Sequence, residues 1–303
     1  MTHRQLYLQA KQALAQAGVD SPGSDAMALL SHFFGLDRPG LALHGEETPS
    51  PEQTAAFLQA VEERAARRPL QYILGAWDFM GLTLAVGEGV LCPREDTAVL
   101  VQALAGLLQD APAPQGLDLC AGTGAVGLGL CSLLPQAQVT ALELSPLALC
   151  YLEENAAAYP QYQVTPHRGD VLSPQTAARF SRHSLDFLAS NPPYIAGEEL
   201  PTLQPEVQKE PSLALDGGAD GLRFYRAIAR LWLPKLKPGA PFAVEIGETQ
   251  AHQVCALFRA HGATALRVHQ DLSGLDRCIT ARVSVTGQDG KIPPQRAFRD
   301  FDP

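Results

Sequence analysis

The fold is constrained most strongly by an alternation of helical and strand-like stretches that begins near residue 97. Apolar residues at helical spacing alternate there with short apolar runs that are typical of buried strands. In chain order, the expected elements are helix 97–108, strand 115–120, helix 125–134, strand 138–144, helix 146–159, strands 162–170 and 184–191, helix 221–236, strand 240–247, helix 249–262, and strands 265–272 and 277–285. This alternation predicts an α/β fold with a mostly parallel sheet and helices on both faces. No helix separates the last two strands, so we expect them to pair as an antiparallel hairpin.

The chain before this region has a different pattern and indicates separate parts. Residues 1–69 show helical apolar spacing with Gly- and Pro-containing interruptions, which predicts a small bundle of about four short helices. Residues 70–92 have short apolar runs separated by glycines, and we expect a β-hairpin linker there. The sheet domain is then expected over 93–285. Residues 286–303 are polar and contain prolines, which indicates a flexible tail.

The net charge narrows the kinds of partner. The 303 residues carry a formal charge of −9 at pH 7. Affinity for nucleic acid grows with the number of phosphates that Lys and Arg neutralise, so we expect no direct nucleic-acid binding. The one locally basic stretch, residues 62–69, is interpreted as the C-terminal end of a helix, where positive charge is favourable.

The six cysteines do not suggest a metal site. They are scattered, form no CxxC pair and mostly lie in apolar runs, so we expect buried free thiols and no bound metal. The N-terminus lacks the continuous apolar segment of a signal peptide, and nowhere do about 18 apolar residues follow one another. We therefore expect a cytoplasmic protein without a membrane partner.

The stretch LDLCAGTGAVGLGL at 117–130 predicts a strand, a glycine turn and the start of a helix. Gly122 and Gly124 let the backbone approach a ligand closely, and the helix offers its N-terminal N–H groups. Glu143 ends the next strand, where a carboxylate can accept both hydroxyls of a ribose. Asp170 ends the strand after that and is placed to accept a hydrogen bond from an adenine amino group. The pattern predicts a cofactor that contains a nucleoside.

Two cofactors fit this loop. Residues 122–127, GTGAVG, match the dinucleotide fingerprint, so a nicotinamide-dependent oxidoreductase is one candidate. However, a long region precedes the loop and no second mononucleotide-binding half follows it. Asp118 stands just before the loop, and its carboxylate repels a pyrophosphate but favours the sulfonium or ammonium of S-adenosylmethionine. We therefore favour the methyl donor over a dinucleotide.

The segment 190–195, SNPPYI, follows another strand and predicts a site for a planar NH2 group. Asn191 supplies a side-chain carbonyl, Pro192 and Pro193 leave rigid backbone carbonyls, and Tyr194 adds an aromatic face. Two carbonyls can accept both hydrogens of an NH2 group, which aims the nitrogen lone pair at a donor methyl group. Positioning then supplies most of the rate, and no general base is required because the substrate loses its proton after transfer.

These motifs together resemble those of a known family. The order LDLCAGTGAVGL, ALELSP, GD and SNPPYI is similar to that in class I S-adenosylmethionine-dependent amino-methyltransferases. Residues 67–94, 210–226, 245–250 and 271–277 further resemble the peptide chain release factor N5-glutamine methyltransferases of the HemK or PrmC type. The similarity spans about residues 4–282.

The resemblance implies a Rossmann-like class I methyltransferase sheet, S-adenosyl-L-methionine as the cofactor, and methylation of the glutamine in the GGQ motif of class I release factors. It implies that the helical N-terminal part and the linker dock the release factor. The catalytic residues would be Asn191, Pro192 and Tyr194, and Pro193 would join them in holding the glutamine. The cofactor-binding residues would be Asp118, Cys120, Ala121, Gly122, Thr123, Gly124, Glu143, Asp170, Val171 and Asn191.

The chain departs from the family pattern at the linker and in the glycine turn. Residues 93–98 read PREDTA where the family usually has PRPETE, and Cys120 stands where glycine is usual. Three residues in or next to the linker, Arg94, Tyr72 and Phe79, fit either linker packing or contact with the substrate.

Four alternatives to release-factor methylation stay open. A ribosomal-protein glutamine methyltransferase shares the NPPY motif, although residues 74–75 and 271–277 favour the release-factor branch. A DNA adenine methyltransferase also shares it, but the negative charge and the absence of a basic recognition region disfavour DNA. From different classes come the nicotinamide-dependent oxidoreductase and a non-catalytic partner protein that binds the cofactor without turnover.

Overall fold

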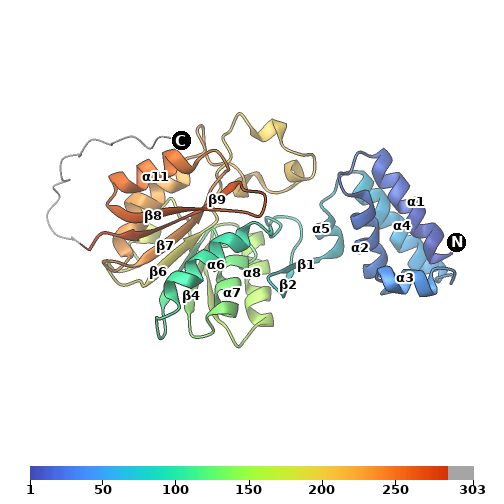
Figure 1. The fold of residues 1–303 in the computed structure, drawn as a ribbon, viewed down its shortest axis with the longest axis horizontal. Helices are drawn as coiled ribbons and strands as arrows, with labels where there is room; N and C mark the ends of the chain where they lie inside the picture. The colour runs from blue at the N-terminus through green and yellow to red at the C-terminus, as the bar shows by residue number, and fades with distance from the viewer. Residues whose placement is uncertain (286–303) are drawn as a thin grey trace.

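The N-terminal part is a helical bundle, as the sequence predicts. The computed structural model describes residues 1–285, so the predicted tail at 286–303 lies outside the described residues. The bundle helices are α1 (His3–Gln16), α2 (Pro22–Phe34), α3 (Arg38–His44), α4 (Pro51–Ala65) and the short α5 (Leu70–Leu74). Their apolar faces meet in a core that includes Leu6, Leu14, Leu29, Leu30 and Phe57. The bundle forms a lobe of its own beside the larger sheet domain (Figure 1).

A β-hairpin follows the bundle, also as predicted. Its strands are β1 (Ala76–Phe79) and β2 (Leu82–Ala85), which pair antiparallel. The two turn residues between them have positive φ angles, 51° at Met80 and 80° at Gly81, a combination that matches the right-handed twist of a hairpin. Phe79 and Leu84 are buried in the same apolar cluster as the sheet domain, so the hairpin packs as part of that domain.

The larger domain contains a seven-stranded sheet in the order β5-β4-β3-β6-β7-β9-β8. All neighbours from β5 to β7 are parallel, whereas β9 is antiparallel to both β7 and β8. This confirms the predicted mostly parallel sheet with an antiparallel hairpin at its C-terminal end. The strands are β3 (Gln115–Leu119), β4 (Gln138–Glu143), β5 (Gln163–Arg168), β6 (Phe187–Ser190), β7 (Pro241–Glu245), β8 (Ala263–Gln270) and β9 (Asp276–Val283).

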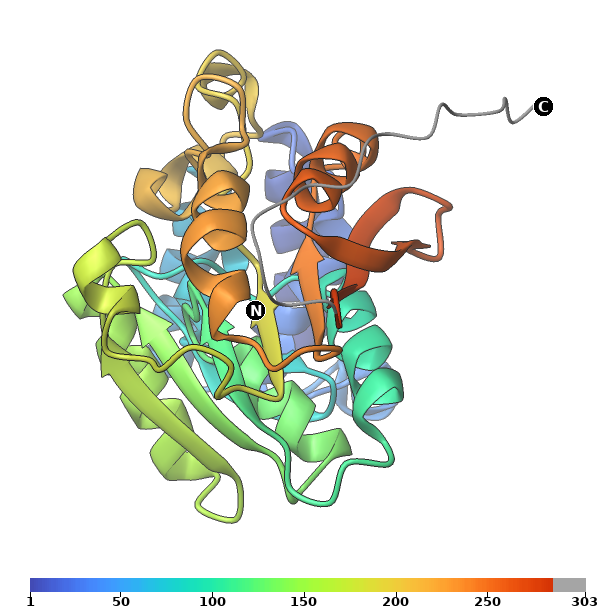
Figure 2. The same cartoon turned by 90° about the vertical axis from the view of Figure 1, so that its left-hand side faces the viewer.

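Helices cover both faces of this sheet (Figure 2). One face packs against α6 (Thr97–Leu108), α7 (Ala125–Leu133) and α8 (Pro146–Ala158). The other packs against α10 (Arg223–Ala227) and α11 (Ala251–Ala260), while the single turn α9 (Pro174–Ala177) adjoins the same cluster. Neighbouring side chains in one strand point to opposite faces, so each buried strand contributes to both apolar layers.

The predicted helix at 221–236 is wrong in detail. After α10 the chain forms a π-helical turn over Ile228–Trp232 and a 3-10 turn over Leu233–Lys235. Pro234 has no N–H to donate to the helical ladder, so the regular helix ends before it. The fully buried Trp232 donates its indole N–H to the Val171 carbonyl at 2.8 Å, a contact that fixes this irregular turn against the loop after β5.

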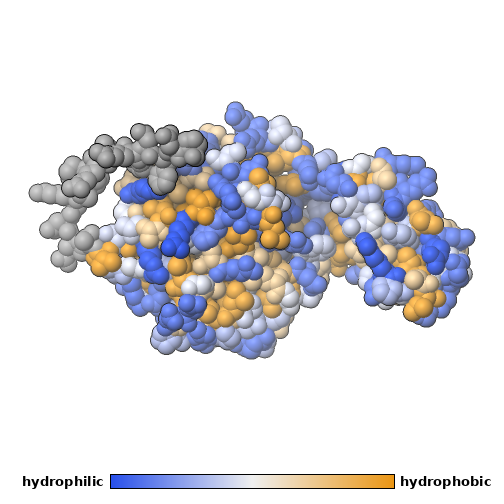
Figure 3. Space-filling model, in the orientation of Figure 1, coloured by the Kyte–Doolittle hydropathy of each residue, from blue (hydrophilic) through white to orange (hydrophobic). Residues whose placement is uncertain are grey.

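The described residues show no helix long and apolar enough to cross a bilayer. On the face drawn in Figure 3, hydrophobic residues are interspersed with hydrophilic ones over both lobes, rather than gathered in a continuous belt. Of the six cysteines, four are buried and Cys120 is partly buried, but Cys150 is exposed, so the expectation of buried thiols fails for Cys150.

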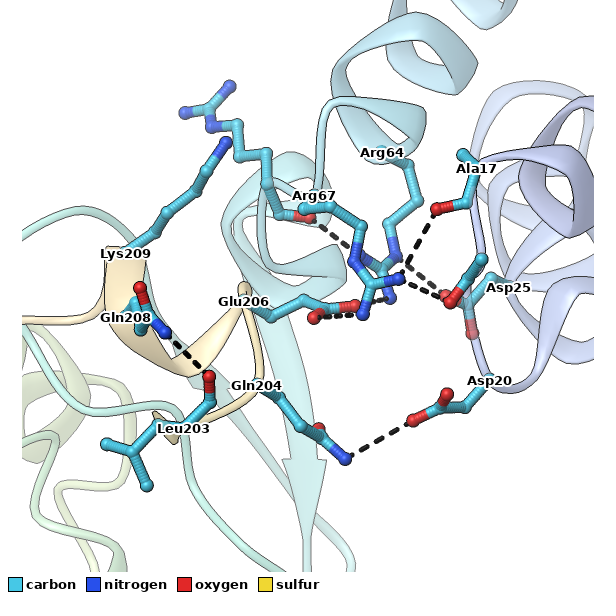
Figure 4. Close-up of polar contacts among 12 residues, drawn as sticks. Ala17, Asp20, Asp25, Arg64, Arg67, Leu203, Gln204, Glu206, Gln208 and Lys209 are labelled. Carbon is cyan, nitrogen blue, oxygen red and sulfur yellow. Dashed lines mark hydrogen bonds and ion pairs between the residues drawn. The ribbon is translucent and has the colours of Figure 1, made fainter. Parts of the chain in front are cut away.

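A long connection between β6 and α10 joins the two lobes through charged side chains. Within this connection, the segment 196–216 carries three 3-10 turns, Leu200–Thr202, Val207–Lys209 and Ser212–Ala214, which the sequence did not indicate. Glu206, in this segment, accepts hydrogen bonds from Arg64 at 2.7 Å and Arg67 at 2.6 Å (Figure 4).

Arg64 also binds Asp25 in α2 at 2.7 Å, and Gln204 donates to Asp20 at 3.2 Å. The basic stretch at 62–69 is thus a helix end, as predicted, because α4 ends at Ala65. The side chains of Arg64 and Glu206 are only 8% and 15% exposed, so solvent screens this contact poorly. The 196–216 segment is therefore fastened to the helical lobe by a partly buried ion-pair network.

We predict that Glu206→Gln releases the 196–216 segment from the helical lobe. The change leaves Arg67 without its anionic partner, so we expect a loss of about 2–3 kcal/mol in local stability. Faster hydrogen exchange over 199–210 would show this loss. Burial alone raises the pKa of Glu206, but the hydrogen bonds from Arg67 and Arg64 outweigh it and lower the pKa.

The stabilisation is therefore complete above about pH 4.3, the ordinary Glu pKa. It is lost as the pH falls through the lowered pKa of the folded protein. Hydrogen exchange in the two proteins should thus converge in acid. Glu46→Gln is the matched control, because the Arg4–Glu46 pair is exposed and contributes little. Equal exchange over 199–210 in the wild type and Glu206→Gln at neutral pH would contradict the prediction.

Candidate active site

The carboxyl ends of four neighbouring strands open into one pocket. The parallel register sets Leu119 of β3 beside Leu142 of β4 and Ser190 of β6, so the loops that follow these strands start at the same level. The pocket encloses about 920 Å³, including its open mouth. The predicted residues that line it are Cys120, Ala121, Gly122, Thr123, Glu143, Asp170, Val171, Asn191 and Pro193. Asp118, Gly124, Pro192 and Tyr194 are not among the lining residues.

The backbone of the glycine turn after β3 has unusual φ angles, and the N–H groups of Ala121, Gly122 and Gly124 already donate within the protein. Gly122 and Gly124 have φ angles of 56° and 84°, and Cys120 reaches 61°, a region that non-glycine residues rarely adopt. A Cβ on Gly124 would lie 2.6 Å from Leu152, so only glycine fits there. At Gly122 a Cβ would meet little except Val90, at 3.9 Å, because this glycine faces the pocket.

Glu143 holds the glycine turn from the neighbouring strand. One carboxylate oxygen accepts the Gly122 N–H at 2.9 Å, and the other accepts the Ser145 N–H at 2.8 Å. The side chain is buried at the end of β4 and still lines the pocket. An ionised carboxylate has about four acceptor positions. Two therefore remain for hydroxyl groups of a ligand.

Asp118 lies beneath the turn and binds the start of α7. Its Oδ2 accepts the Gly127 N–H at 3.0 Å, in the first turn of α7. The cap residue of this helix is Gly124, which has no side chain to bind that N–H, so Asp118 takes the role of the cap. Burial raises the pKa of Asp118 to about 7, although the Gly127 N–H opposes the rise. The sequence placed this carboxylate against the cofactor, whereas the structure places it under the loop.

The loop after β5 brings Asp170 and Val171 to the opposite wall. Asp170 Oδ1 accepts the Leu172 N–H at 2.8 Å, which fixes the carboxylate at the pocket. Val171 is buried, and its carbonyl accepts the Trp232 indole N–H. Hydrogen bonds therefore hold this wall, and one acidic group and one apolar side chain line the pocket there.

The segment after β6 divides between the pocket and the protein interior. Asn191 lines the pocket and donates its Nδ2 to the Thr97 hydroxyl at 3.2 Å. Tyr194 packs against the apolar layer of the α10 face, and its carbonyl accepts the Gln250 side-chain amide at 2.8 Å. Burial raises the pKa of the Tyr194 phenol. Its ring therefore anchors the turn, while Asn191 and Pro193 face the pocket.

Residues from the linker and the 196–216 segment complete the pocket. The sequence predicted no role for most of them. Pro211, Leu213 and Ala214 line one side. Glu210 is buried, accepts the Cys92 N–H at 2.9 Å and pairs with Arg94, which also lines the pocket. Glu210 lies in the stretch EPSLALDGG at 210–218, which resembles the family pattern. The sequence alone does not show that this carboxylate would meet Cys92 and Arg94.

The other two linker residues serve packing. Tyr72 is buried and donates its hydroxyl to the Val90 carbonyl at 2.6 Å. Phe79 is buried against α6 and α7. Of the three residues left open between packing and substrate contact, only Arg94 therefore reaches the pocket.

Similarity to known proteins extends over nearly the whole chain. The model described as PrmC N-terminal domain matches residues 5–75, and that described as Methyltransferase small domain matches residues 87–210. A release factor glutamine methyltransferase from Moorella thermoacetica is 41% identical over 93% of this chain and 98% of its own length. One from Geobacter sulfurreducens is 40% identical over 89% of this chain and 93% of its own.

The chain belongs to the release factor glutamine methyltransferase family. The hMettl16 catalytic domain, at 15% identity and a TM-score of 0.52, covers 81% of this chain and 85% of that structure, and it shares the fold alone. The fold class predicted from the sequence is thus confirmed. Within residues 1–285 there is no cluster of three or more His, Cys, Asp or Glu side chains that could hold a metal ion.

We predict that Gly124→Ala destabilises the protein. The positive φ and the 2.6 Å approach to Leu152 together should cost about 2 kcal/mol or more in the free energy of unfolding. Gly106→Ala is the matched control. It lies in α6 with nothing within 4 Å, so alanine there should raise stability by about 0.5–1 kcal/mol. Chemical unfolding of both variants tests the pair, and equal stabilities would contradict the prediction.

Proposed function

We propose that this chain transfers a methyl group from S-adenosyl-L-methionine to the side-chain amide nitrogen of the glutamine in the GGQ motif of class I release factors. The observation that carries the proposal is the placement of Asn191 in the pocket formed by the glycine turn, Glu143 and Asp170. Family membership supports the same reaction, because the relatives are named for glutamine methylation of release factors.

The acceptor groups in the pocket fit S-adenosylmethionine. Glu143 keeps acceptor positions for the ribose hydroxyls, and Asp170 can accept from the adenine amino group. Gly122 leaves room beside the turn, where a Cβ would otherwise enter the pocket. We assign the methionine part to residues 120–124 and the adenine region to Asp170 and Val171. When bound, the cofactor supplies an electrophilic methyl group on a sulfonium.

The chain's own residues bind and orient the substrate amide. In the proposal, Asn191 Oδ1 and a backbone carbonyl of the Pro192–Pro193 turn accept the two N–H hydrogens of the glutamine. This holds the nitrogen in line with the methyl group, and the gain comes from orientation rather than from proton removal before transfer. The nitrogen loses its proton after the new bond forms. Tyr194, anchored by Gln250, keeps the turn from moving away.

A two-lobed protein with a pocket beside both lobes is suited to a protein substrate. We propose that the helical bundle and the linker contact the release factor while its glutamine loop enters the pocket beside Leu213, which is half exposed at the mouth. The net charge of −9 agrees with a protein partner rather than with direct contact to nucleic acid. No feature of the pocket favours hydride transfer or DNA methylation over this reaction.

We predict that Asn191→Ala lowers kcat by about 100- to 1000-fold, the loss expected when one preorganised hydrogen-bonding group is removed. The measurement is the transfer of a labelled methyl group to a purified class I release factor. A release factor whose GGQ glutamine is replaced should accept no label, and a ribosomal protein offered as substrate separates the related glutamine methyltransferase. Full activity of Asn191→Ala would refute the mechanism.

Binding of the methyl donor is tested separately by calorimetry. S-adenosylmethionine should bind the purified protein, whereas NADH should not, because the N–H groups of Ala121, Gly122 and Gly124 already donate within the protein and leave a pyrophosphate few donors in the turn. Tight binding of NADH without binding of S-adenosylmethionine would return the assignment to an oxidoreductase.

A further inference from the structure

A chain of three polar side chains leads from the interior to Asn191. Thr97 donates its hydroxyl to Glu245 Oε2 at 2.6 Å and accepts the Asn191 Nδ2 at 3.2 Å. Thr97 and Glu245 are each 3% exposed, so neither exchanges these partners for bulk water. None of the steps attributed to the pocket above uses Thr97 or Glu245.

The fold brings these residues together from three separate places. Glu245 is the last residue of β7, and Asn191 directly follows β6, the parallel neighbour. Their register pairs Ser190 with Val244, so Asn191 and Glu245 are the next residues along the two strands. Thr97 begins α6, which packs across β7. The contact is therefore fixed by the sheet register and one helix start, not by a mobile loop.

We propose that Thr97 and Glu245 are positioning residues that fix which end of the Asn191 carboxamide faces the substrate. This role rests on the proposed function, in which Asn191 must accept a hydrogen bond from the substrate amide. A carboxamide has an oxygen and an NH2 group of nearly the same shape, so its orientation depends on its partners. To fix this orientation, the chain of hydrogen bonds must contain a group that can only accept or only donate.

The ionised Glu245 supplies that fixed polarity. A carboxylate only accepts hydrogen bonds, so the Thr97 hydroxyl must donate to it. That hydroxyl has a single hydrogen, so toward Asn191 it can only accept, and Asn191 must turn its NH2 toward Thr97. The Asn191 amide also lowers the pKa of the Glu245 carboxyl group. Oδ1 is thus left for the pocket, where an N–H of the substrate can donate to it.

Protonation of Glu245 would remove this constraint. A carboxyl group can donate to Thr97, whose hydroxyl is then free to donate to Asn191, and the amide can turn over. Burial raises the pKa of Glu245 to about 7. The hydrogen bond from Thr97, the charge of Arg277 and the Asn191 amide oppose the rise, and Asp96 adds to it. The other titratable groups that face Glu245 are Tyr194, Tyr225 and Cys278.

The test compares variants in methyl transfer to a purified class I release factor. Thr97→Val keeps the shape but removes both hydrogen bonds, and we expect kcat to fall about 10- to 100-fold with little change in the KM for S-adenosylmethionine. Thr97→Ser retains the hydroxyl and should recover most of the rate. Thr280→Val is the matched control, because it removes another buried hydroxyl, one that contacts His269, and its kcat should stay that of the wild type.

The pH profile separates a positioning role from a structural one. In the wild type, kcat should fall as the pH drops through the pKa of Glu245, because only the carboxylate fixes the orientation. Glu245→Gln preserves the shape but can present either an oxygen or an NH2 to Thr97. Its kcat should be lower at neutral pH, and this acid limb should be absent. An unchanged profile in Glu245→Gln, or a wild-type kcat in Thr97→Val, would overturn the proposal.

A second readout does not depend on the reaction. The side-chain amide resonance of Asn191, assigned by its loss in Asn191→Ala, should move with pH in the wild type as Glu245 titrates and stay fixed in Glu245→Gln. If the wild type transfers no methyl group to the release factor, the proposed function fails. The resonance still decides whether the chain of hydrogen bonds sets the orientation of Asn191, and a pH-independent resonance in the wild type would overturn it.

Discussion

The pocket depends on two carboxylates that hold the glycine turn after β3 from opposite sides. Asp118 binds the first turn of α7 from below, and Glu143 binds Gly122 from the neighbouring strand. A turn with three positive φ angles has little preference for one shape on its own, so these contacts determine where its N–H groups point. The parallel register of β3 and β4 supplies both carboxylates at the required height. The ligand site is thus set by strand positions and not by the loop alone.

Carboxylates also determine how the remaining walls are assembled. Glu210 ties the 196–216 segment to the linker at Cys92 and Arg94, and Glu206 ties the same segment to the helical lobe. Glu245 extends the pattern to the inner side of Asn191. Buried acids need partners, because an unpaired charge away from water is costly. Each of these acids therefore joins segments that lie far apart in the sequence, which explains how a protein with a net negative charge keeps a well-defined pocket.

Most of the fold could be predicted from the sequence, because the sheet and the regular helices follow from local periodicity. Helices 97–108 and 125–134 and the strand that ends at Glu143 were expected within a residue or two of their observed bounds. The break after Ala227 was missed, since a π-helical turn has nearly the same apolar spacing as an α-helix. The 196–216 segment was missed because its partners, such as Arg64, lie more than a hundred residues away.

The lining of the pocket could be predicted where a motif coincides with a strand end, as at Glu143, Asp170 and Asn191. Asp118 directly precedes the glycine turn in the sequence, yet it does not line the pocket. Alternate residues of a strand face opposite sides, and this one faces α7. Thr97 and Glu245 stood within the motifs PREDTA and EIGETQ, but their meeting depends on the order of β6 and β7 in the sheet. That order is a property of the assembled fold.

The 196–216 segment is held at both of its sides, by the helical lobe through Glu206 and by the linker through Glu210, and it forms one wall of the pocket between them. The segment is therefore attached at two separate places. A change in the position of the bundle should move the wall of the pocket at Leu213, because Glu206 and Glu210 lie in the same short segment as Leu213.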